Sequence, residues 1–275
     1  MTLVQAQPEA PACVISHAGG TLHLLPQRAA WWPEQRALLV ADVHLGKATS
    51  FAALGVPLGP AALGGTTRTD LVRLAELVRA LGAQHLVVLG DLLHAAHGCD
   101  HHVLAALTDF GRELRQTAAL TLVRGNHDDK AGDPPPEARF VCVDQPWALG
   151  ALMCRHHPPL HPPVQPPAQP RAQPPLHPPA QRESLSEAAS CAQHISTLSA
   201  IASEVHPPLT LCGHIHPAVS LRDMTRRRER APCFWLSSGV LVLPAFGSFT
   251  GGKAINPRPG DAVFAVGPDA VLRVR

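Results

Sequence analysis

Five short clusters of polar side chains in the sequence have the residue types and spacing of metal ligands. Each follows an apolar run: Asp42-Val43-His44, Gly90-Asp91, Gly125-Asn126-His127-Asp128, His156-His157 and Gly213-His214-Ile215-His216. Carboxylate, imidazole and amide oxygen without thiolate suit manganese, iron or zinc in a mixed nitrogen and oxygen site. On an extended backbone, residues two positions apart lie on the same side, so Asp42 and His44 can face one ion, as can the pair at 214 and 216.

These clusters stand at the ends of predicted strands. Buried strands are predicted at 36–44, 85–91 and 120–128, and further strands at 148–157, 209–216, 234–246 and 261–267. Helices are predicted between the first three strands, at 67–83 and 103–116. The order βαβαβ, followed by a mostly β half, indicates one α/β domain with sheets packed face to face between helix layers. Because ligands gather beyond the carboxyl ends of strands in such sheets, we expect the five clusters to meet.

The composition indicates a globular protein without a membrane span. Hydrophobic residues make up 45% of the 275, and no apolar run reaches the roughly 18 residues that a spanning helix needs. The N-terminus lacks the pattern of a secretory signal, so we expect a cytoplasmic protein. The seven cysteines include no C-x-x-C pair, which favours buried thiols over a disulfide framework or a cysteine zinc site. A net charge of +2 gives no independent argument for nucleic-acid binding.

Proline is concentrated between about 158 and 182. Such density removes backbone donors, so we expect a single domain over residues 1–275 that carries an extended or disordered insertion there. A surface insertion without a function of its own is the expected interpretation, and a partner-binding tract is the alternative. A helix is expected at 184–205, where apolar residues have weak three- and four-residue spacing.

The order D-x-H, G-D, G-N-H-D, H and G-H-x-H resembles that of the calcineurin-like metallophosphoesterase superfamily over nearly the whole chain. Further segments, among them LLVADVHLGK, CGHIHPAV, PCFW and LPAFGSFTGG, are similar to the bacterial DNA-ligase-associated branch of that superfamily. The Pro-rich insertion departs from the branch, but only in the loop between the fourth and fifth clusters. The resemblance implies an αββα sandwich of two packed mixed sheets flanked by helices.

The resemblance also implies two divalent metal ions, with manganese expected and iron or zinc as alternatives. Carried over residue by residue, one ion would be held by Asp42, His44, Asp91 and His216, and the other by Asp91, Asn126, His156 and His214. His156 is chosen over His157 because the first histidine of the H-H-P pattern is usually the ligand in the family. Two such ions lower the pKa of a shared water, and with only two carboxylates the centre stays positive enough to attract a phosphodiester.

Two further residues have expected catalytic roles, and two have expected contacts with the substrate. His127 would protonate the leaving alkoxide. Asp128 would orient or charge-stabilise His127, or else cap the loop beside the site. His94 is expected to contact substrate or steady a ligand, with a structural role as the alternative. Arg124, like Lys47, lies next to a ligand cluster and could meet phosphate oxygens.

The expected activity is that of a manganese-dependent phosphodiesterase or nuclease. The resemblance implies DNA or RNA ends in repair as its substrate, and a DNA ligase or helicase as functional partner. One alternative is a phosphodiesterase or phosphatase of small nucleotides, and another is a non-catalytic scaffold with the same fold. The basic run Arg226–Arg230 is expected to be a solvated loop, with nucleic-acid contact as the alternative.

Overall fold

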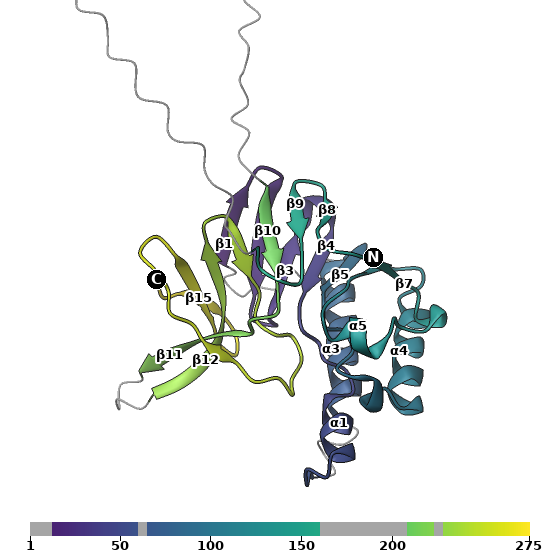
Figure 1. Cartoon of the computed structure of the whole chain (residues 1–275). Coiled ribbons are helices and arrows are strands. Elements are labelled where there is room, and N and C mark those ends of the chain that lie inside the picture. Colours follow the sequence, from purple (N-terminus) through teal and green to yellow (C-terminus); the bar gives the residue numbers. More distant parts are fainter. Residues whose placement is uncertain (1–12, 60–64, 160–207, 223–227) are drawn as a thin grey trace, which may run out of the picture. The chain divides into compact units, whose positions relative to one another are not determined.

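Two β-sheets packed face to face form most of the computed structural model, which describes residues 13–59, 65–159, 208–222 and 228–275 (Figure 1). The Pro-rich insertion predicted at 158–182 falls outside these residues from 160 on, as does the helix predicted at 184–205. Both stay predictions, as does the single domain over 1–275. None of the described helices is long and apolar enough to cross a membrane.

The first sheet contains the strands that carry most of the predicted ligands. Its strands follow one another in space in chain order: β1 (Cys13–His17), β2 (Gly20–Leu25), β3 (Ala29–Trp32), β4 (Ala37–Val40), β5 (His85–Leu89), β6 (Ala119–Val123) and β7 (Phe140–Val143). Neighbours from β1 to β4 are antiparallel, and those from β4 to β7 are parallel. The carboxyl ends of β4, β5 and β6 therefore lie at one edge of the sheet.

The second sheet is built from the later part of the chain. Its strands are β8 (Trp147–Leu149), β9 (Leu152–Cys154), β10 (Leu209–Cys212), β11 (Pro217–Arg222), β12 (Arg228–Ser237), β13 (Val240–Val242), β14 (Lys253–Ala254), β15 (Ala262–Val266) and β16 (Val271–Arg273). The spatial order is β14-β11-β12-β13-β10-β9-β8, and β15 pairs with β12 and β16. β9 and β10 are parallel, so their carboxyl ends also lie side by side.

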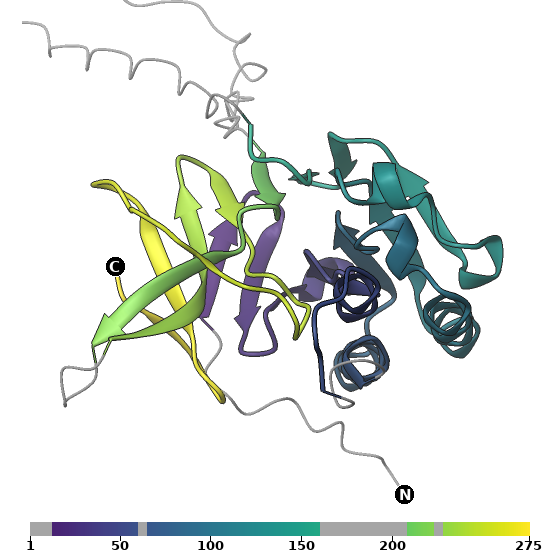
Figure 2. The ribbon, with the colours of Figure 1, turned by 60° about the horizontal axis from the view of Figure 1, so that its bottom comes forward.

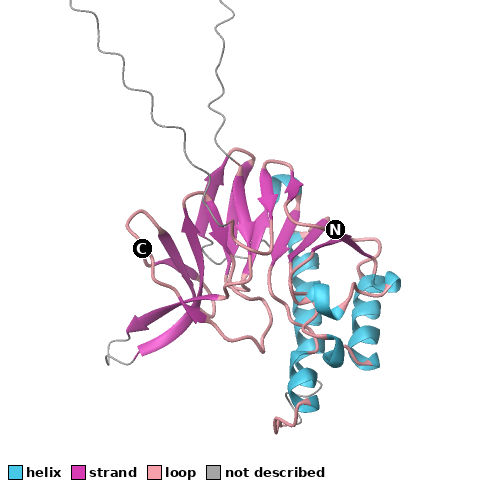
Figure 3. Cartoon of the chain, viewed as in Figure 1, coloured by secondary structure: helices cyan, strands magenta, loops and turns pink. Residues whose placement is uncertain are grey.

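Apolar side chains fill the space between the sheets, where Trp32 of the first sheet and Phe234 of the second are almost fully buried. The opposite face of the first sheet is covered by α3 (Gly65–Leu81) and α4 (His101–Glu113), which bury Leu74 and Phe110 in a second cluster. The helices gather on that side in Figures 2 and 3, away from the strands of the second sheet. The predicted α/β sandwich of two packed mixed sheets is confirmed, and the described helices cover its first sheet.

The structure differs from the predicted strands at two places. The single strand predicted at 148–157 is a hairpin of β8 and β9, and the one predicted at 234–246 contains the end of β12 and all of β13. At the second turn Ser238 and Gly239 both have positive φ, of 47° and 77°. Two such residues in succession make the tight turn that joins paired antiparallel strands. The residues Ser237, Ser238 and Gly239 mark this reversal of the chain, which the predicted single strand overlooked.

Candidate metal centre and active site

The five predicted ligand clusters lie in the loops that follow β4, β5, β6, β9 and β10. Main-chain hydrogen bonds tie these loops together. The N–H of Asp42 donates to the carbonyl of Gly90 at 3.1 Å, and that of Gly213 donates to the carbonyl of His156 at 3.1 Å. Segments far apart in the sequence are thus held against one another at the edge where the parallel strands end.

The first group of donor atoms comes from three of these loops. The Nε2 atom of His44 lies 3.2 Å from Nε2 of His216 and 3.7 Å from Oδ2 of Asp91. The same atom of His216 lies 3.3 Å from Oδ1 of Asp42. The structure therefore brings together the four side chains predicted to hold the first ion.

The second group is centred on His156. Its Nε2 atom lies 3.1 Å from Oδ1 of Asn126, 3.1 Å from Nδ1 of His214 and 3.4 Å from Oδ1 of Asp91. These are the four residues predicted for the second ion. Both groups include Asp91, which presents Oδ2 to His44 and Oδ1 to His156. A carboxylate placed in this way has the geometry expected of a bridging ligand.

The protonation of His44, His214 and Asp91 suits metal binding. Burial lowers the pKa of His44 to about 2, and burial together with the neighbouring imidazoles lowers that of His214. Burial opposes the ionisation of Asp91, but the hydrogen bond and charge of His156 outweigh it and lower the pKa to about 2. Neutral imidazoles and an ionised carboxylate are the forms in which these side chains bind metal. At His156 burial lowers the pKa, but the hydrogen bond and charge of Asp91 outweigh it and raise the pKa, so a metal ion would have to displace a proton there.

The spacing of the donor atoms suits metal ions as well. Atoms that surround one ion at bond lengths of about 2.0–2.2 Å stand roughly 3–3.5 Å apart. The two facing pairs of imidazole nitrogens, His44 with His216 and His156 with His214, are 3.2 and 3.1 Å apart. Such sets of three donors recur within the described residues, for example Asp42, His44 and His216. The residues present therefore fit divalent ions in both groups.

Close packing at the loop glycines leaves no room for a side chain. A Cβ atom on Gly125 would lie 2.4 Å from Oδ1 of Asp91, and one on Gly213 would lie 2.6 Å from Oδ2 of Asp42. Both values are below any ordinary contact, so each glycine lets the main chain pass directly over a ligand carboxylate.

Five of the seven predicted ligands have the left-handed backbone conformation. Their φ angles are 54° at Asp42, 52° at His44, 53° at Asp91, 69° at His214 and 51° at His216. This conformation costs a non-glycine residue about 1–2 kcal/mol, and such residues cluster at active sites. Hydrogen bonds between the loops hold them there, for example from the N–H of His214 to the carboxylate of Asp42 at 2.9 Å.

His127 lies at the edge of the first group with its ring fixed on one side. Its Nδ1 atom is 2.5 Å from the carbonyl oxygen of His94. A carbonyl only accepts hydrogen bonds, so Nδ1 carries a proton and Nε2 is left to take up or release one. The side chain is 33% exposed, and Nε2 lies 4.0 Å from Oδ2 of Asp91. His127 is therefore accessible and close to the donor atoms.

His94 contacts both His127 and a predicted ligand. Its ring stacks on that of His127, with centroids 4.8 Å apart and planes at 19°. Its Nδ1 atom lies 3.2 Å from Nδ1 of His44. Nε2 of His44 faces the other donor atoms of the first group, so His94 contacts the opposite side of the His44 ring. Of the roles expected for His94, the contacts favour steadying a ligand.

Asp128 does not contact the His127 ring, contrary to the orienting role expected for it. Its buried carboxylate accepts hydrogen bonds from the main-chain N–H groups of Asp91, Leu93 and Gly125, at 2.7, 3.0 and 2.9 Å. These bonds tie the loop after β5 to the loop after β6. The alternative expectation, a cap of the loop beside the site, describes this arrangement.

Arg124 is not brought to the donor groups, contrary to the substrate contact expected for it. Its guanidinium donates to both carboxylate oxygens of Asp133 and to Asp144, each at 2.8 Å, and these bonds raise its pKa. Lys47, the first residue of α1 (Lys47–Ala53), is different. Burial lowers its pKa, and the charges of Asp42 and Asp91 oppose that shift. Lys47 is therefore a cation that lies close to both carboxylates.

The surroundings of His156 and His157 differ, and this bears on which of the two is the metal ligand. His156 is fully buried, and its Nδ1 atom lies 3.0 Å from the carbonyl of Leu89, which turns Nε2 toward the donor group. The side-chain oxygen of Gln145 accepts hydrogen bonds from the main-chain N–H groups of both histidines, each at 3.0 Å. The Nε2 atom of Gln145 lies 3.0 Å from Nδ1 of His157. The geometry favours His156 as the ligand. Sequence reasoning missed Gln145, which stands alone between two strands.

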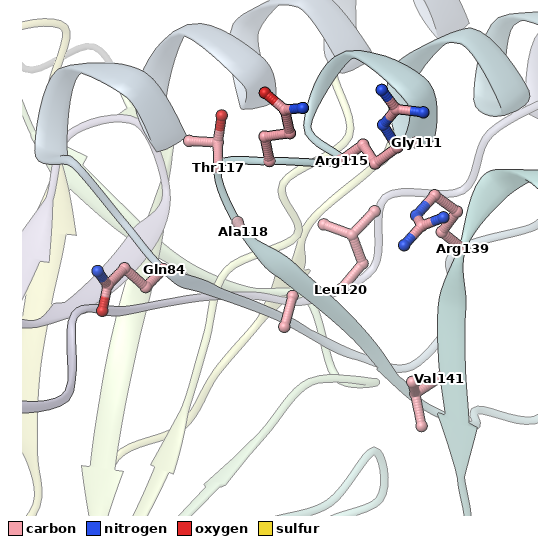
Figure 4. Close-up of a pocket in the computed structure, with 10 residues that line it drawn as sticks. Gln84, Gly111, Arg115, Thr117, Ala118, Leu120, Arg139 and Val141 are labelled. Carbon is pink, nitrogen blue, oxygen red and sulfur yellow. The ribbon is translucent and has the colours of Figure 1, made fainter.

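A separate cavity of about 460 Å³ lies where β5 and β6 begin, at the opposite edge of the first sheet. Figure 4 shows its lining, which includes Gln84, Arg115, Leu120 and Arg139. No predicted site residue lines this cavity.

The chain also matches a family model. The model described as calcineurin-like phosphoesterase matches residues 35–218, a span that contains all seven predicted ligands. The chain belongs to the calcineurin-like phosphoesterase family. Members of this family usually bind two divalent metals, and they hydrolyse phosphoester bonds. Membership therefore supports a metal-dependent hydrolase.

Among solved structures, the crystal structure of the nuclease MPE from Pseudomonas putida is similar to this member of the calcineurin-like family. The two share 33% sequence identity with a TM-score of 0.67, and the match covers 96% of this chain and 100% of the other. A search among curated proteins gave no match.

Proposed function

We propose that this chain is a two-metal phosphodiesterase that cleaves nucleic acid, with manganese as its metal. The observation that carries the proposal is the pair of donor groups that share Asp91, with the accessible ring of His127 beside them. The similarity to a nuclease over nearly the whole chain supports nucleic acid as the substrate.

The side chains have complementary roles in this reaction. When bound, two divalent ions would lower the pKa of a shared water and neutralise phosphate oxygens. Asp42 and Asp91 supply the only carboxylates of the ligand set, and Asn126 contributes a neutral oxygen, which keeps the centre attractive to an anion. His127, with Nδ1 held by the carbonyl of His94, would donate the proton on Nε2 to the leaving oxygen.

The biological setting is a further part of the proposal. The similarity of segments such as 243–252 to the DNA-ligase-associated branch supports a role in DNA repair in the cytoplasm, with a ligase or helicase as functional partner. A phosphodiesterase or phosphatase of small nucleotides is the second candidate, since the donor groups would serve either substrate. A scaffold without activity is disfavoured because every predicted ligand position is filled.

The first experiment is hydrolysis of bis-p-nitrophenyl phosphate and of p-nitrophenyl phosphate by the metal-stripped protein, with and without Mn²⁺. Turnover of the diester that requires Mn²⁺ is expected. A preference for the monoester would favour the phosphatase alternative. Bound ions without turnover of either substrate would favour the scaffold.

A further inference from the structure

A groove of about 440 Å³ opens beside the metal centre, with the predicted ligand His216 in its wall. The rest of the wall comes from β11, β12, the turn before β3 and the loop between β13 and β14, and it includes Arg28, Arg230, Ser248 and Thr250. In Figure 1 the paired strands β11 and β12 extend away from the rest of the second sheet. The groove therefore leads from the metal centre onto this pair of strands.

The charged side chains that line this groove are all positive. Arg28 and Arg230 line it, and no carboxylate does. Arg28 is half-buried, and burial lowers the pKa of its guanidinium while the charge of Asp70 opposes that shift. The guanidinium makes one long hydrogen bond, from Nη1 to the carbonyl of Ala245 at 3.5 Å. Since a guanidinium has five N–H donors, most of those on Arg28 remain available to an anion.

A second hollow of about 610 Å³ continues the groove. It shares Arg28, Arg230 and Pro232 with the first and extends to Arg73 and Leu272. Its lining contains one carboxylate, that of Glu229. Positive charge therefore extends beyond the reach of a single phosphate group bound at the metal centre.

Arg230 lies on a regular element. Arg230 stands in β12 opposite Ser220 of β11, so the part of the run Arg226–Arg230 that the structure describes belongs to a strand and not to a loop. Residues 226 and 227 lie outside the described part. A strand holds the position of Arg230 relative to His216 more firmly than a solvated loop would.

We propose that this groove holds the backbone of a nucleic-acid strand next to the scissile phosphate, with Arg28 and Arg230 contacting its flanking phosphates. Planar guanidinium groups suit this task because they donate two parallel hydrogen bonds to phosphate oxygens. The inference rests on the proposed phosphodiesterase function and adds to it the path by which a polymer reaches the centre.

The test compares Arg230→Glu with Arg115→Glu in the full chain. Binding is measured without added metal, so that the strands are not cleaved, and turnover is measured with Mn²⁺. Arg115 is the matched control because it lies at the cavity of Figure 4, at the other edge of the first sheet. Fluorescence anisotropy measures binding of single-stranded DNA and RNA of 4 and 20 nucleotides over a range of salt concentrations. Turnover of bis-p-nitrophenyl phosphate, which has no flanking phosphate groups, is measured alongside.

Arg230→Glu is expected to weaken binding of the 20-nucleotide strands by roughly tenfold or more and to reduce the salt slope by about 1. Its turnover of the small diester should stay within about twofold of wild type, and Arg115→Glu should change neither quantity. Arg28→Met is a second variant that removes charge without adding any, and the same loss is expected.

Equal binding of the 20-nucleotide strands by Arg230→Glu and Arg115→Glu would contradict the proposed role of the groove. A wild type that binds no strand would contradict it as well. If the wild type turns over the small diester in either case, the proposed phosphodiesterase survives. Binding that depends on Arg230 without any diester turnover would support the groove and overturn the proposed activity. A difference between DNA and RNA would identify which strand it accepts.

Discussion

The carboxylate of Asp128 holds the main chain of Asp91, with 2.7 Å between Oδ2 and the amide nitrogen. The same carboxylate accepts hydrogen bonds from the N–H groups of Leu93 and Gly125. The main chain of Asp91, the residue common to the two donor groups, is therefore held by the loop after β6. Burial raises the pKa of Asp128 to about 6 against the effect of these hydrogen bonds. Asp128 is thus a positioning residue for Asp91.

Asp128→Asn should weaken metal binding without removing any ligand. Asparagine keeps the shape but turns an N–H₂ group toward N–H donors, which leaves buried groups without partners. We expect a loss of about 1–3 kcal/mol in the free energy of unfolding and a lower metal affinity in calorimetric titration. The exposed neighbour provides the control, Asp129→Asn. Equal metal affinity in the two variants would contradict this role.

Asp91→Asn should abolish metal binding and turnover together. The change removes a charge that both donor groups face and replaces one oxygen by a group that cannot bind a cation. Elemental analysis of the purified variant should give fewer ions per chain than wild type, and diester turnover should be lost. A variant that retains two ions with full occupancy would show that Asp91 is not shared.

His127→Ala should keep the metal and lose turnover. Removal of the general acid is expected to cost roughly 10²–10⁴-fold on a diester with a poor leaving group, such as DNA. The loss should be smaller on bis-p-nitrophenyl phosphate because p-nitrophenolate leaves without being protonated. Full activity on the poor leaving group would make the acid assignment wrong.

Gly125→Ala should lower metal affinity through a steric effect alone. Its Cβ atom would overlap with Oδ1 of Asp91 and force the carboxylate or the loop to move. Gly59→Ala is the matched control, since a Cβ atom there meets nothing within 4 Å. The two are compared by metal titration and thermal unfolding. Identical metal affinities would mean that the loop can shift without cost.

Arg124→Met should leave diester turnover unchanged. The guanidinium is taken up by Asp133 and Asp144, and the lost ion pairs, partly exposed, should cost no more than about 1 kcal/mol of stability. Steady-state kinetics on bis-p-nitrophenyl phosphate and on DNA measure the turnover, and urea unfolding measures the stability. A large rise in KM on DNA would restore the substrate contact expected from the sequence.

The elements that could be predicted from the sequence are those with a strong local pattern. β4 and most of β5 are runs of buried apolar residues because both faces of the first sheet are covered. α3 buries Leu71, Leu74 and Val78 at helical spacing. The strands β1 to β3 were missed, since they are short and vary in burial without a clean alternation.

The predicted ligands could be found in the sequence because each stands at the end of a strand in a recognisable order. The contacts around the candidate site could not. Gln145, the partners of Arg124 and the carbonyl of His94 act through contacts that only the folded chain creates, and no local spacing marks them. Asp128 lies within a motif, but its hydrogen-bond partner at Asp91 is 37 residues away.

The left-handed backbone at five predicted ligand positions has a consequence for how the sequence would change if the activity were no longer needed. The backbone of those residues is costly to the fold, and as predicted ligands their side chains are useful only for binding metal. A lineage released from selection for activity would gain stability by replacing them with glycine or asparagine, which adopt this backbone at less cost. Inactive descendants should therefore carry small residues at 42, 44, 91, 214 and 216, and aspartate or histidine at all five marks a lineage still under selection for its chemistry.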